Sequence, residues 1–328
     1  MLIDERTTPA RAGSGRATAT VRVEAKEQVA EGVVAVTLAR PDGGRLPDWA
    51  PGAHIDVALP DGTLRQYSLC GDRWDPYRYR IGVLREPRGR GGSRYVHDEL
   101  RPGDVLGFAG PRNNFAMVPA SRYLFIAGGI GITPLLPMVH QAEHVGADWT
   151  LVYGGRSRSS MAFLDRLARY SDRVHVRSED EHGLLDLAAW LGVPRPDFAV
   201  YCCGPAGLLD AVESRCRAWQ PHALHTERFV ARERAAPIRD LPFQVELARS
   251  AVTVTVTPDV SVLDALHTAG VDVLSSCRQG TCGTCEAVVL EGIPDHRDSI
   301  LDDHQRARGD CLYPCVSRSC TERLVLDL

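Results

Sequence analysis

The sequence has no apolar run long enough to cross a membrane. The stretch that comes nearest, Leu124–Val139, has 16 nearly uncharged residues, among them three glycines and two prolines. A membrane-spanning helix needs about 20 apolar residues, so a buried strand, a turn and the start of a helix fit this stretch better. The first 20 residues also lack the apolar segment of a signal peptide. We therefore expect a cytoplasmic protein that has no membrane partner.

The sequence also lacks a strong excess of charge of either sign. Its 38 Lys and Arg residues and 42 Asp and Glu residues give a formal net charge of −4, which argues against a nucleic-acid-binding protein, because such proteins are usually basic. It contains no internal repeat, and no ordered motif combines the Ser, His and acidic residues of a hydrolase. Its 328 residues, 44% of them apolar, suffice for two or three globular domains, and we expect a monomer.

Hydrophobic periodicity divides the chain into three structured regions. Residues 17–118 contain short alternating runs such as "TVRVEA" and "YRYRIGVL", which predict an antiparallel β-barrel or sandwich. In residues 119–229 apolar strands alternate with helical patterns, which predicts a parallel α/β sheet. Residues 230–241 have the composition of a linker, and residues 242–328 form a compact third domain. Residues 1–16 are predicted to be a disordered tail.

Two helix starts can be located from their capping residues. In the third domain Ser261 can cap a short helix, with Asp264 three residues later and Gly270 at its end. In the second domain Thr133 is expected to be the N-cap of a helix and Pro134 its first residue.

The segment "GGIGITP", Gly128–Pro134, follows a predicted strand and opens this second helix. Its glycines would let the backbone approach a pyrophosphate at the positive end of the helix. The segment departs from the dinucleotide-binding fingerprint, because Pro134 stands where the third glycine is expected and no acidic residue ends the next strand. Taken alone, it fits a tight turn as well as a nucleotide site.

Three cysteines lie within nine residues of the third domain. Cys277, Cys282 and Cys285 have the spacing C-x4-C-x2-C, which is the spacing of plant-type [2Fe–2S] proteins when a fourth cysteine follows. Gly280 and Gly283 between them would let backbone N–H groups turn toward the sulfurs. A structural zinc site is the alternative, although such sites favour paired C-x2-C units. The spacing leaves the fourth ligand open among three later cysteines: Cys311, Cys315 and Cys320.

A family resemblance selects the fourth ligand. The stretch "CRQGTCGTCEAVVLEGIPDHRDSIL", followed by "CVSRS" and "LVLDL", resembles the C-terminal ferredoxin domain of the phthalate dioxygenase reductase family. In that family the fourth ligand begins the Cys-Val-Ser-Arg stretch, which implies Cys315. The resemblance makes Cys311 and Cys320 bystanders.

Three motifs upstream extend the resemblance. Arg65-x-Tyr67-Ser68, the glycine segment and "CGP" at Cys203–Pro205 together resemble the ferredoxin–NAD(P) reductase superfamily. With the cysteine segment, the chain resembles phthalate dioxygenase reductase and vanillate O-demethylase reductases from about Ala17 to Leu328. The resemblance implies a β-barrel flavin domain, a parallel α/β nucleotide domain and a plant-type ferredoxin domain with the β-grasp fold.

The resemblance also implies roles for individual residues. Arg65 would lie near the flavin phosphate, Tyr67 beside the ring, and Phe229 over part of the flavin, although Arg65 and Tyr67 could be an ordinary strand-end pair and Phe229 could be interdomain core. A phosphate-binding segment without a recognisable adenine-binding site implies FMN rather than FAD. We interpret His54 as structural. The cofactor-binding set is Arg65, Gln66, Tyr67, Ser68, Gly92, Ser93, Gly129, Gly131, Thr133, Cys203, Gly204 and Phe229, of which Tyr67, Ser68 and Cys203 are the catalytic candidates.

The function implied is electron transfer from NADH through FMN and a [2Fe–2S] cluster to a separate oxygenase, either a Rieske oxygenase such as an O-demethylase or a cytochrome P450. A self-contained flavin reductase and a redox-sensing iron–sulfur protein are the alternatives. Charge favours NADH over NADPH, because Glu179 and Asp180 would repel a 2′-phosphate, although other groups nearby could attract one: Arg156, Arg158, Arg177 and Ser178.

A group of acidic residues after the cysteine loop could dock a basic partner, or could form a solvated turn. The group comprises Glu291, Asp295, Asp298, Asp302 and Asp303. If these carboxylates dock the partner, electron transfer should slow as the salt concentration rises.

Overall fold

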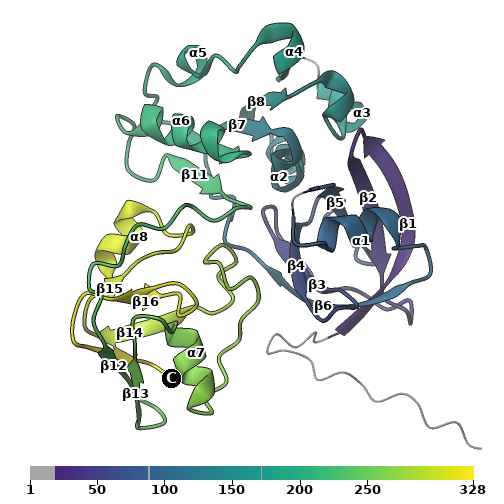
Figure 1. Ribbon diagram of the computed structural model, residues 1–328. Coiled ribbons are helices and arrows are strands. Elements are labelled where there is room, and N and C mark those ends of the chain that lie inside the picture. Colours follow the sequence, from purple (N-terminus) through teal and green to yellow (C-terminus); the bar gives the residue numbers. More distant parts are fainter. Residues whose placement is uncertain (1–18, 88, 171) are drawn as a thin grey trace, which may run out of the picture.

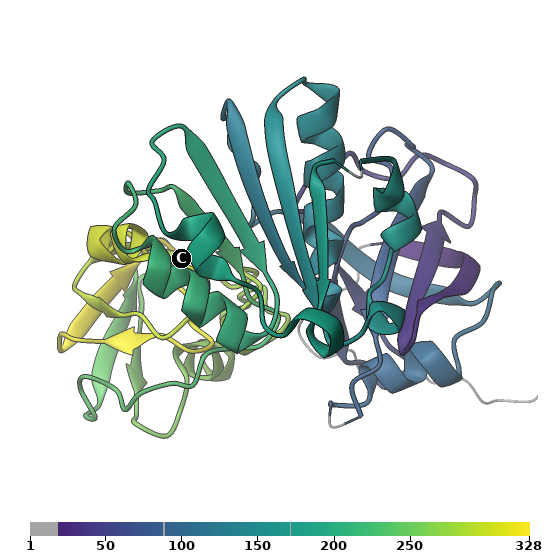
Figure 2. The same cartoon turned by 90° about the horizontal axis from the view of Figure 1, so that it is seen from above.

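The computed structural model describes residues 19–87, 89–170 and 172–328, so the predicted tail at residues 1–16 lies outside the described residues. The described chain forms three lobes, each built around its own sheet (Figure 1). The three sheets fall within the three predicted regions and have the predicted antiparallel, parallel and ferredoxin-type arrangements. Figure 2 shows the lobes side by side, with the parallel sheet between the other two.

The first lobe is a β-barrel of six antiparallel strands in the order β4-β3-β6-β1-β2-β5. A bridge between Leu69 and Ile81 joins the chain after β4 to β5 and closes the barrel. Alternate residues such as Ile55 and Val57 are buried inside it, as the period of two requires. The elements are β1 Ala19–Ala30, β2 Val33–Ala39, β3 His54–Ala58, β4 Leu64–Ser68, β5 Arg78–Leu84, α1 Gly92–Asp98 and β6 Val105–Arg112.

The second lobe is a parallel sheet in the order β11-β10-β7-β8-β9 with helices on both faces. Phe125 and Tyr201 pack on the face that α2 covers, whereas Ile126 and Val200 pack on the face that α5 and α6 cover. Both faces are therefore apolar, as in other buried parallel sheets. Its strands are β7 Arg122–Gly128, β8 Asp148–Gly155, β9 Val174–Ser178, β10 Phe198–Cys203 and β11 Leu224–Glu227, and its helices are α2 Ile132–His144, α3 Leu164–Leu167, α4 Glu179–His182, α5 Leu187–Leu191 and α6 Ala206–Cys216.

The third lobe is a five-stranded sheet in the order β13-β12-β18-β14-β16, against which α7 packs. Ser261 Oγ accepts the N–H of Asp264 at the start of α7, and Gly270 adopts a φ of 80° just beyond its end, so both predicted helix signals are confirmed. The elements are β12 Phe243–Leu247, β13 Val252–Val256, α7 Val262–Thr268, β14 Ala287–Glu291, β15 Pro294–Asp295, α8 Asp303–Arg308, β16 Cys311–Leu312, β17 Arg318–Ser319 and β18 Arg323–Leu326.

The predicted start of the second-lobe helix was wrong by two residues. A short 3₁₀ turn at Gly129–Gly131 leads directly into α2, which begins at Ile132. Thr133 therefore lies within the first turn, and its Oγ1 donates to the Ile130 carbonyl at 2.9 Å instead of capping the helix. Pro134 remains in the first turn, where proline is tolerated.

The barrel and the second lobe share a hydrophobic core. Val33 and Ala35 of the barrel pack in the same cluster as Ile132 and Met138 of α2. On β5 a Cβ at Gly82 would lie 2.8 Å from Thr133 Cγ2, so the glycine allows the two lobes to approach closely. No helix among the described residues is long and apolar enough to span a bilayer.

Candidate functional site

A pocket opens where the three lobes meet. Its cavity volume is about 140 Å³, and the cavity is open to solvent on one side. The barrel, the end of the second lobe and the cysteine loop of the third lobe all contribute to its wall. The lining residues are His54, Leu64, Arg65, Gln66, Ser68, Arg90, Glu227, Arg228, Phe229, Cys277, Gln279 and Thr281.

Two arginines, Arg65 and Arg90, lie at the barrel side of this pocket, and Gly92 at the start of α1 contacts Arg65. Arg65 donates from Nη1 to the Leu64 carbonyl and from Nη2 to the Arg90 carbonyl, each at 2.9 Å. A Cβ at Gly92 would lie 2.6 Å from Arg65 Nε, so the two predicted flavin segments are in contact. Ser93 accepts the N–H of Glu86 at 3.0 Å. The Arg65 and Arg90 cations give this end of the pocket the character of an anion site.

Glu227 is the carboxyl group of the pocket wall, and its side chain is half-buried. Burial raises the pKa of its carboxyl to about 8, although a hydrogen bond from Ser68 opposes the shift. Ser68 Oγ donates to Glu227 Oε2 at 3.4 Å, a long contact that links the barrel to the second lobe. Glu227 ends β11, directly opposite Cys203 at the end of β10.

The glycine segment and the Cys203 segment are also in contact. A Cβ at Gly131 would lie 2.1 Å from the Cys203 carbonyl oxygen, and a Cβ at Gly204 would lie 3.0 Å from Gly128. Gly129 has a φ of 54°, which favours glycine. These loops follow the carboxyl ends of adjacent parallel strands, where open α/β sheets bind their ligands. Burial and the neighbouring Glu227 carboxyl raise the pKa of the Cys203 thiol.

The structure brings together the four cysteines that the sequence analysis selected. Cys277 hydrogen-bonds with Cys282, and Cys285 hydrogen-bonds with Cys315. These contacts lower the pKa values of the Cys277 and Cys285 thiols. Two thiol pairs match a [2Fe–2S] cluster, in which each iron takes two thiolates.

The cysteine loop has the backbone that this ligand set requires. Gly280 and Gly283 both have a φ of 71°. The N–H of Gln279 donates to Cys277 Sγ at 3.3 Å, and the N–H of Thr284 donates to Cys282 Sγ at 3.5 Å. Amide donors therefore point at the sulfurs as expected, and such bonds tune the potential of iron–sulfur clusters.

The two flanking cysteines contact other groups. Cys311 lies in β16 opposite Val288, and Cys320 Sγ donates weakly to the Pro294 carbonyl. Among the described residues no three His, Cys, Asp or Glu side chains surround one point as a single metal ion would require. The two separate thiol pairs, Cys277 with Cys282 and Cys285 with Cys315, are the arrangement of a two-iron cluster.

Two hydrogen bonds attach the cysteine loop to the barrel. Gln66 Nε2 donates to Ser276 Oγ at 3.0 Å, and Asn114 Nδ2 donates to the Cys282 carbonyl at 2.7 Å. A Cβ at Gly283 would lie 2.4 Å from Asn114 Nδ2. Cys277 of the cysteine loop and Gln66 of the barrel consequently line the same pocket.

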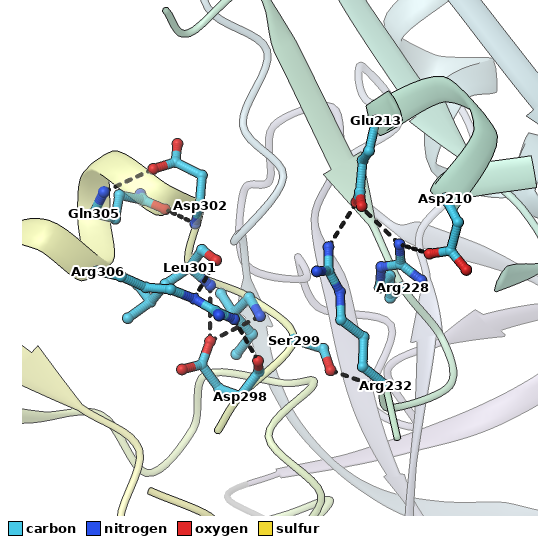
Figure 3. Close-up of polar contacts among 11 residues, drawn as sticks. Asp210, Glu213, Arg228, Arg232, Asp298, Ser299, Leu301, Asp302, Gln305 and Arg306 are labelled. Atoms are coloured by element: carbon cyan, nitrogen blue, oxygen red, sulfur yellow. Dashed lines mark hydrogen bonds and ion pairs between the residues drawn. The ribbon is translucent and has the colours of Figure 1, made fainter. Parts of the chain in front are cut away.

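An arginine network holds the segment that carries Glu227 and Phe229. Figure 3 shows Arg228 and Arg232 directed at Glu213 of α6. Buried Arg228 also donates to Asp210 at 2.7 Å, and the backbone N–H of Arg232 donates to Ser299 Oγ at 2.9 Å. Near its start, at Arg232, the predicted linker is thus bonded to both the second lobe and the third.

Several predicted residues do not lie in the pocket wall. Tyr67 packs against the barrel core instead, and burial raises its pKa to about 12; its place beside a flavin ring stays a prediction. Arg177 is exposed, and Ser178 is buried with no hydrogen-bond partner for its Oγ among the described residues. The N–H of Asp180 donates to the Arg156 carbonyl at 3.1 Å, so the predicted nucleotide-selecting residues are neighbours.

The predicted acidic docking group requires a correction. Asp295 and Asp298 are buried: the first accepts the N–H of Ile238 in the linker, and the second accepts the N–H groups of Ile300 and Leu301. Their carboxylates hold turns beside the cysteine loop and do not face a partner. The exposed members are Glu291, Asp302 and Asp303, and Asp302 caps α8.

Apart from His54, which was interpreted as structural, sequence reasoning missed six pocket residues, of which Glu227 and Arg90 are the two that matter most for the chemistry. Glu227 belongs to the same "ERF" stretch as Phe229, but nothing in an isolated Glu indicates that it will be buried. Only the position of β11 at the edge of the sheet, facing the barrel, creates its environment.

The chain matches known proteins along nearly its whole length. Residues 245–321 match the family of 2Fe-2S iron-sulfur cluster binding domains. The chain is 44% identical over 319 residues to phenoxybenzoate dioxygenase subunit beta of Ectopseudomonas oleovorans, which covers 97% of this chain and 99% of that protein.

Two solved structures extend the comparison. Phthalate dioxygenase reductase, described as a modular structure for electron transfer from pyridine nucleotides to [2Fe–2S], aligns at 35% identity with a TM-score of 0.69 and covers 94% of this chain and 97% of that one. An intact type IV self-sufficient cytochrome P450 monooxygenase aligns at 41% identity with a TM-score of 0.91 and covers 98% of this chain. The chain spans only 43% of the length of that monooxygenase.

Proposed function

Because the chain belongs to the family of oxygenase reductases that includes phthalate dioxygenase reductase, we propose that it passes electrons from NADH through FMN and a [2Fe–2S] cluster to a separate oxygenase. The observation that carries this proposal is the shared pocket. Its wall contains the barrel residues Arg65 and Ser68 together with the cluster cysteine Cys277. A cofactor held there touches both the nucleotide lobe and the iron–sulfur lobe.

The pocket fits FMN. Arg65 and Arg90 supply positive charge for a single phosphate, and Phe229, with 43% of its surface exposed, supplies an apolar cover. His54, Ser68 and Glu227 line the wall as well. When bound, the flavin accepts a hydride from the nicotinamide and releases electrons singly, which is the chemistry of the cofactor itself.

The protein positions the nucleotide segment and the cysteine loop, and it sets the protonation state of Glu227. Gly131 and Gly204 let the nucleotide segment lie against Cys203, while the hydrogen bonds of Gln66 and Asn114 hold the cysteine loop on the barrel. Glu227, with a pKa of about 8, is largely protonated at neutral pH. It therefore offers a neutral acid that can hydrogen-bond beside the flavin without adding negative charge.

The acceptor proposed is an oxygenase, and the comparisons favour two classes. The relative from Ectopseudomonas oleovorans is a subunit of a dioxygenase, whereas the self-sufficient monooxygenase is a cytochrome P450. NADH is the proposed donor because Glu179 and Asp180 are the first residues after β9 and would repel a 2′-phosphate. A monomeric state and a cytoplasmic location stay predictions.

The absorption spectrum of the anaerobically purified full chain, followed during titration with NADH, tests the proposal. We expect flavin bands and an iron–sulfur shoulder, both bleached by NADH. A flavin spectrum with no iron or sulfide after reconstitution would overturn the proposal and restore the zinc alternative. Bleaching of the flavin alone, with the cluster left oxidised, would instead favour a self-contained flavin reductase.

A further inference from the structure

Lys26 is the only lysine in the chain, and its side chain holds one end of α1. It lies in β1 of the barrel, opposite Val36 of β2. Its Nζ donates to three carbonyl oxygens, those of Val96 at 3.0 Å, His97 at 2.8 Å and Leu100 at 2.8 Å. An ammonium group has three N–H donors, so all of them are used on the last turn of α1 and the residues just after it.

The end of α1 depends on such partners. The final carbonyl groups of a helix have no donor within the helix itself. α1 has only seven residues, and a helix of this length is not stable in water on its own. Its position is therefore set by its contacts with the barrel: Val96 and Leu100 pack in the barrel core, and Lys26 supplies polar contacts.

The other polar contacts at this end of α1 are weaker or belong to the same segment. Arg85 pairs with Asp98, but both side chains are exposed, and exposed ion pairs contribute little to stability. Arg101 donates to two carbonyls of the segment, but it follows α1 directly in the chain and would move with it. His97 Nε2 makes a single contact with the Val83 carbonyl at 2.9 Å. The three bonds from β1 are therefore the main polar anchor of this end.

The opposite end of α1 lies against the pocket. Arg65 Nη2 donates to the carbonyl of Arg90, two residues before α1 begins. A Cβ at Gly92 would lie 2.6 Å from Nε and 2.8 Å from Cγ of Arg65, so the Arg65 side chain lies directly against the backbone of the first turn. Arg65 and Arg90 both line the pocket. A helix of this length spans about 10 Å, so the end that Lys26 holds is one short element away from the two cations.

We propose that Lys26 is a positioning residue for the flavin phosphate: its three bonds fix α1, and α1 in turn fixes Arg65 and Arg90 in the pocket wall. The proposal rests on the proposed function, because it requires FMN with its phosphate at these two cations. It distinguishes between two flavins. FMN carries the phosphate and riboflavin lacks it, so loss of Lys26 weakens the binding of FMN and leaves the binding of riboflavin nearly unchanged.

The chain offers a matched control in Arg78. This residue is a cation on the barrel strand β5, and it pairs with Glu24, two residues before Lys26 in β1. Its other ion-pair partner is Asp75. Both partners lie outside α1 and outside the pocket wall. Lys26→Met and Arg78→Met therefore remove one barrel cation that holds α1 and one that pairs with other groups.

The test is a fluorescence titration of FMN and of riboflavin into the flavin-depleted full-length chain. We expect Lys26→Met to weaken FMN binding about tenfold, which corresponds to about 1.4 kcal/mol, and to change riboflavin binding less than about twofold. Lys26→Arg should recover most of the FMN affinity, because a guanidinium can donate to the same carbonyls. Arg78→Met should bind both flavins like the wild type.

A double-mutant cycle with Arg65 tests the route of the effect. Arg65→Ala removes a cation through which Lys26 acts, so Lys26→Met should weaken FMN binding much less in that background than in the wild type. Fully additive losses would show that Lys26 does not act through Arg65, and would overturn the proposal.

Three further results would also overturn the inference. Equal losses of FMN and riboflavin binding in Lys26→Met would indicate a general structural effect, and unchanged FMN binding would show that α1 does not need this anchor. A wild-type chain that binds FMN no more tightly than riboflavin would show that the two cations do not hold the phosphate. If Lys26→Met fails to fold, Lys26→Gln is compared by the same criteria, and failure of both makes Lys26 structural only. A wild-type chain that binds neither flavin would instead refute the proposed function.

Discussion

Cys315 is the C-terminal cysteine whose thiol meets Cys285, whereas Cys311 and Cys320 contact other groups. We expect Cys315→Ser to lose most of its iron and the visible absorption of the cluster, because one iron would lack a thiolate. Cys311→Ser and Cys320→Ser should keep both. Iron and sulfide analysis with visible spectroscopy measures this difference, and loss of the cluster in either flanking variant would contradict the ligand assignment.

The half-buried carboxyl of Glu227 makes the stability of the protein depend on pH. Its pKa is about 8 in the folded chain against an ordinary value of 4.5, so folding favours the protonated form. Its stabilising contribution is complete below pH 4.5 and is lost as the pH rises through 8. Glu227→Gln cannot ionise and escapes this loss.

Denaturant unfolding at several pH values tests the effect. Between pH 4.5 and 8.5 the wild type should lose at least about 1.4 kcal/mol of unfolding free energy relative to Glu227→Gln, the equivalent of one pKa unit. Ser68→Ala should shift the transition to higher pH, because the Ser68 hydrogen bond lowers the Glu227 pKa. Parallel pH profiles for the wild type and Glu227→Gln would show that the carboxyl does not titrate in this range.

The sequence identifies residues whose role depends on their near neighbours and misses those whose role depends on tertiary burial. Cys277, Cys282 and Cys285 share one loop, so their spacing alone predicts a ligand set. Glu227 acquires its properties only where the barrel and the second lobe meet. An isolated Glu in a strand gives no sign of such burial.

Among the elements, the cysteine loop is held on the barrel by side chains that the sequence does not pair. The Gln66–Ser276 hydrogen bond joins residues 210 positions apart. We expect Gln66→Ala and Ser276→Ala each to slow electron transfer from flavin to cluster, with the double variant no slower than the worse single variant, because both remove the same bond. Flavin reduction by NADH should be little changed.

Stopped-flow absorption separates the two steps, since flavin and cluster absorb differently. The double-mutant cycle should give a coupling of about 0.5–1.5 kcal/mol, as for one hydrogen bond. Additive effects of the two substitutions would mean that the contact does not position the loop. As an independent variant, Asn114→Ala removes the other bond, to the Cys282 carbonyl, and should slow the same step.

Element type was predictable because local periodicity determines it, whereas element boundaries depended on packing. The alternation of apolar and polar residues in "TVRVEA" and "FQVELA" predicted strands, and the Ser261 cap predicted the start of α7. The start of α2 differed because the glycines of Gly129–Gly131 form a 3₁₀ turn that continues into the helix. Thr133 is buried against Gly82 of the barrel, a contact that local capping rules do not include.

At the scale of the whole molecule, the sequence predicts three lobes but does not predict how they pack against one another. Each lobe buries its own apolar pattern, so its fold can be inferred from its own residues. Their arrangement depends on a core shared by the barrel and the second lobe and on the Arg228–Glu213–Arg232 network. The pocket at their junction therefore appears only in the assembled structure.

The distribution of charge over the lobes leads to a prediction about docking. Residues 242–328 contain 13 Asp and Glu against 7 Lys and Arg, a net charge of −6, whereas residues 1–241 contain 29 against 31, a net charge of +2. The iron–sulfur lobe is thus the acidic part of a chain whose total charge is only −4. An electron acceptor with a basic surface should be attracted to it.

Oxidised cytochrome c, a basic protein, is a suitable probe of this surface. Its reduction by NADH through the full chain should slow several-fold between about 0.05 and 0.5 M salt, because the Debye length falls to a few ångströms over this range. Asp303→Lys, at an exposed position of α8, should slow the reaction at low salt and flatten its salt dependence. The matched reversal Asp48→Lys, on an exposed carboxylate of the barrel, should change neither. Equal effects of the two charge reversals would mean that the net charge of the chain alone attracts the acceptor. A reduction rate that does not change with salt concentration would show that electrostatic attraction does not contribute to docking.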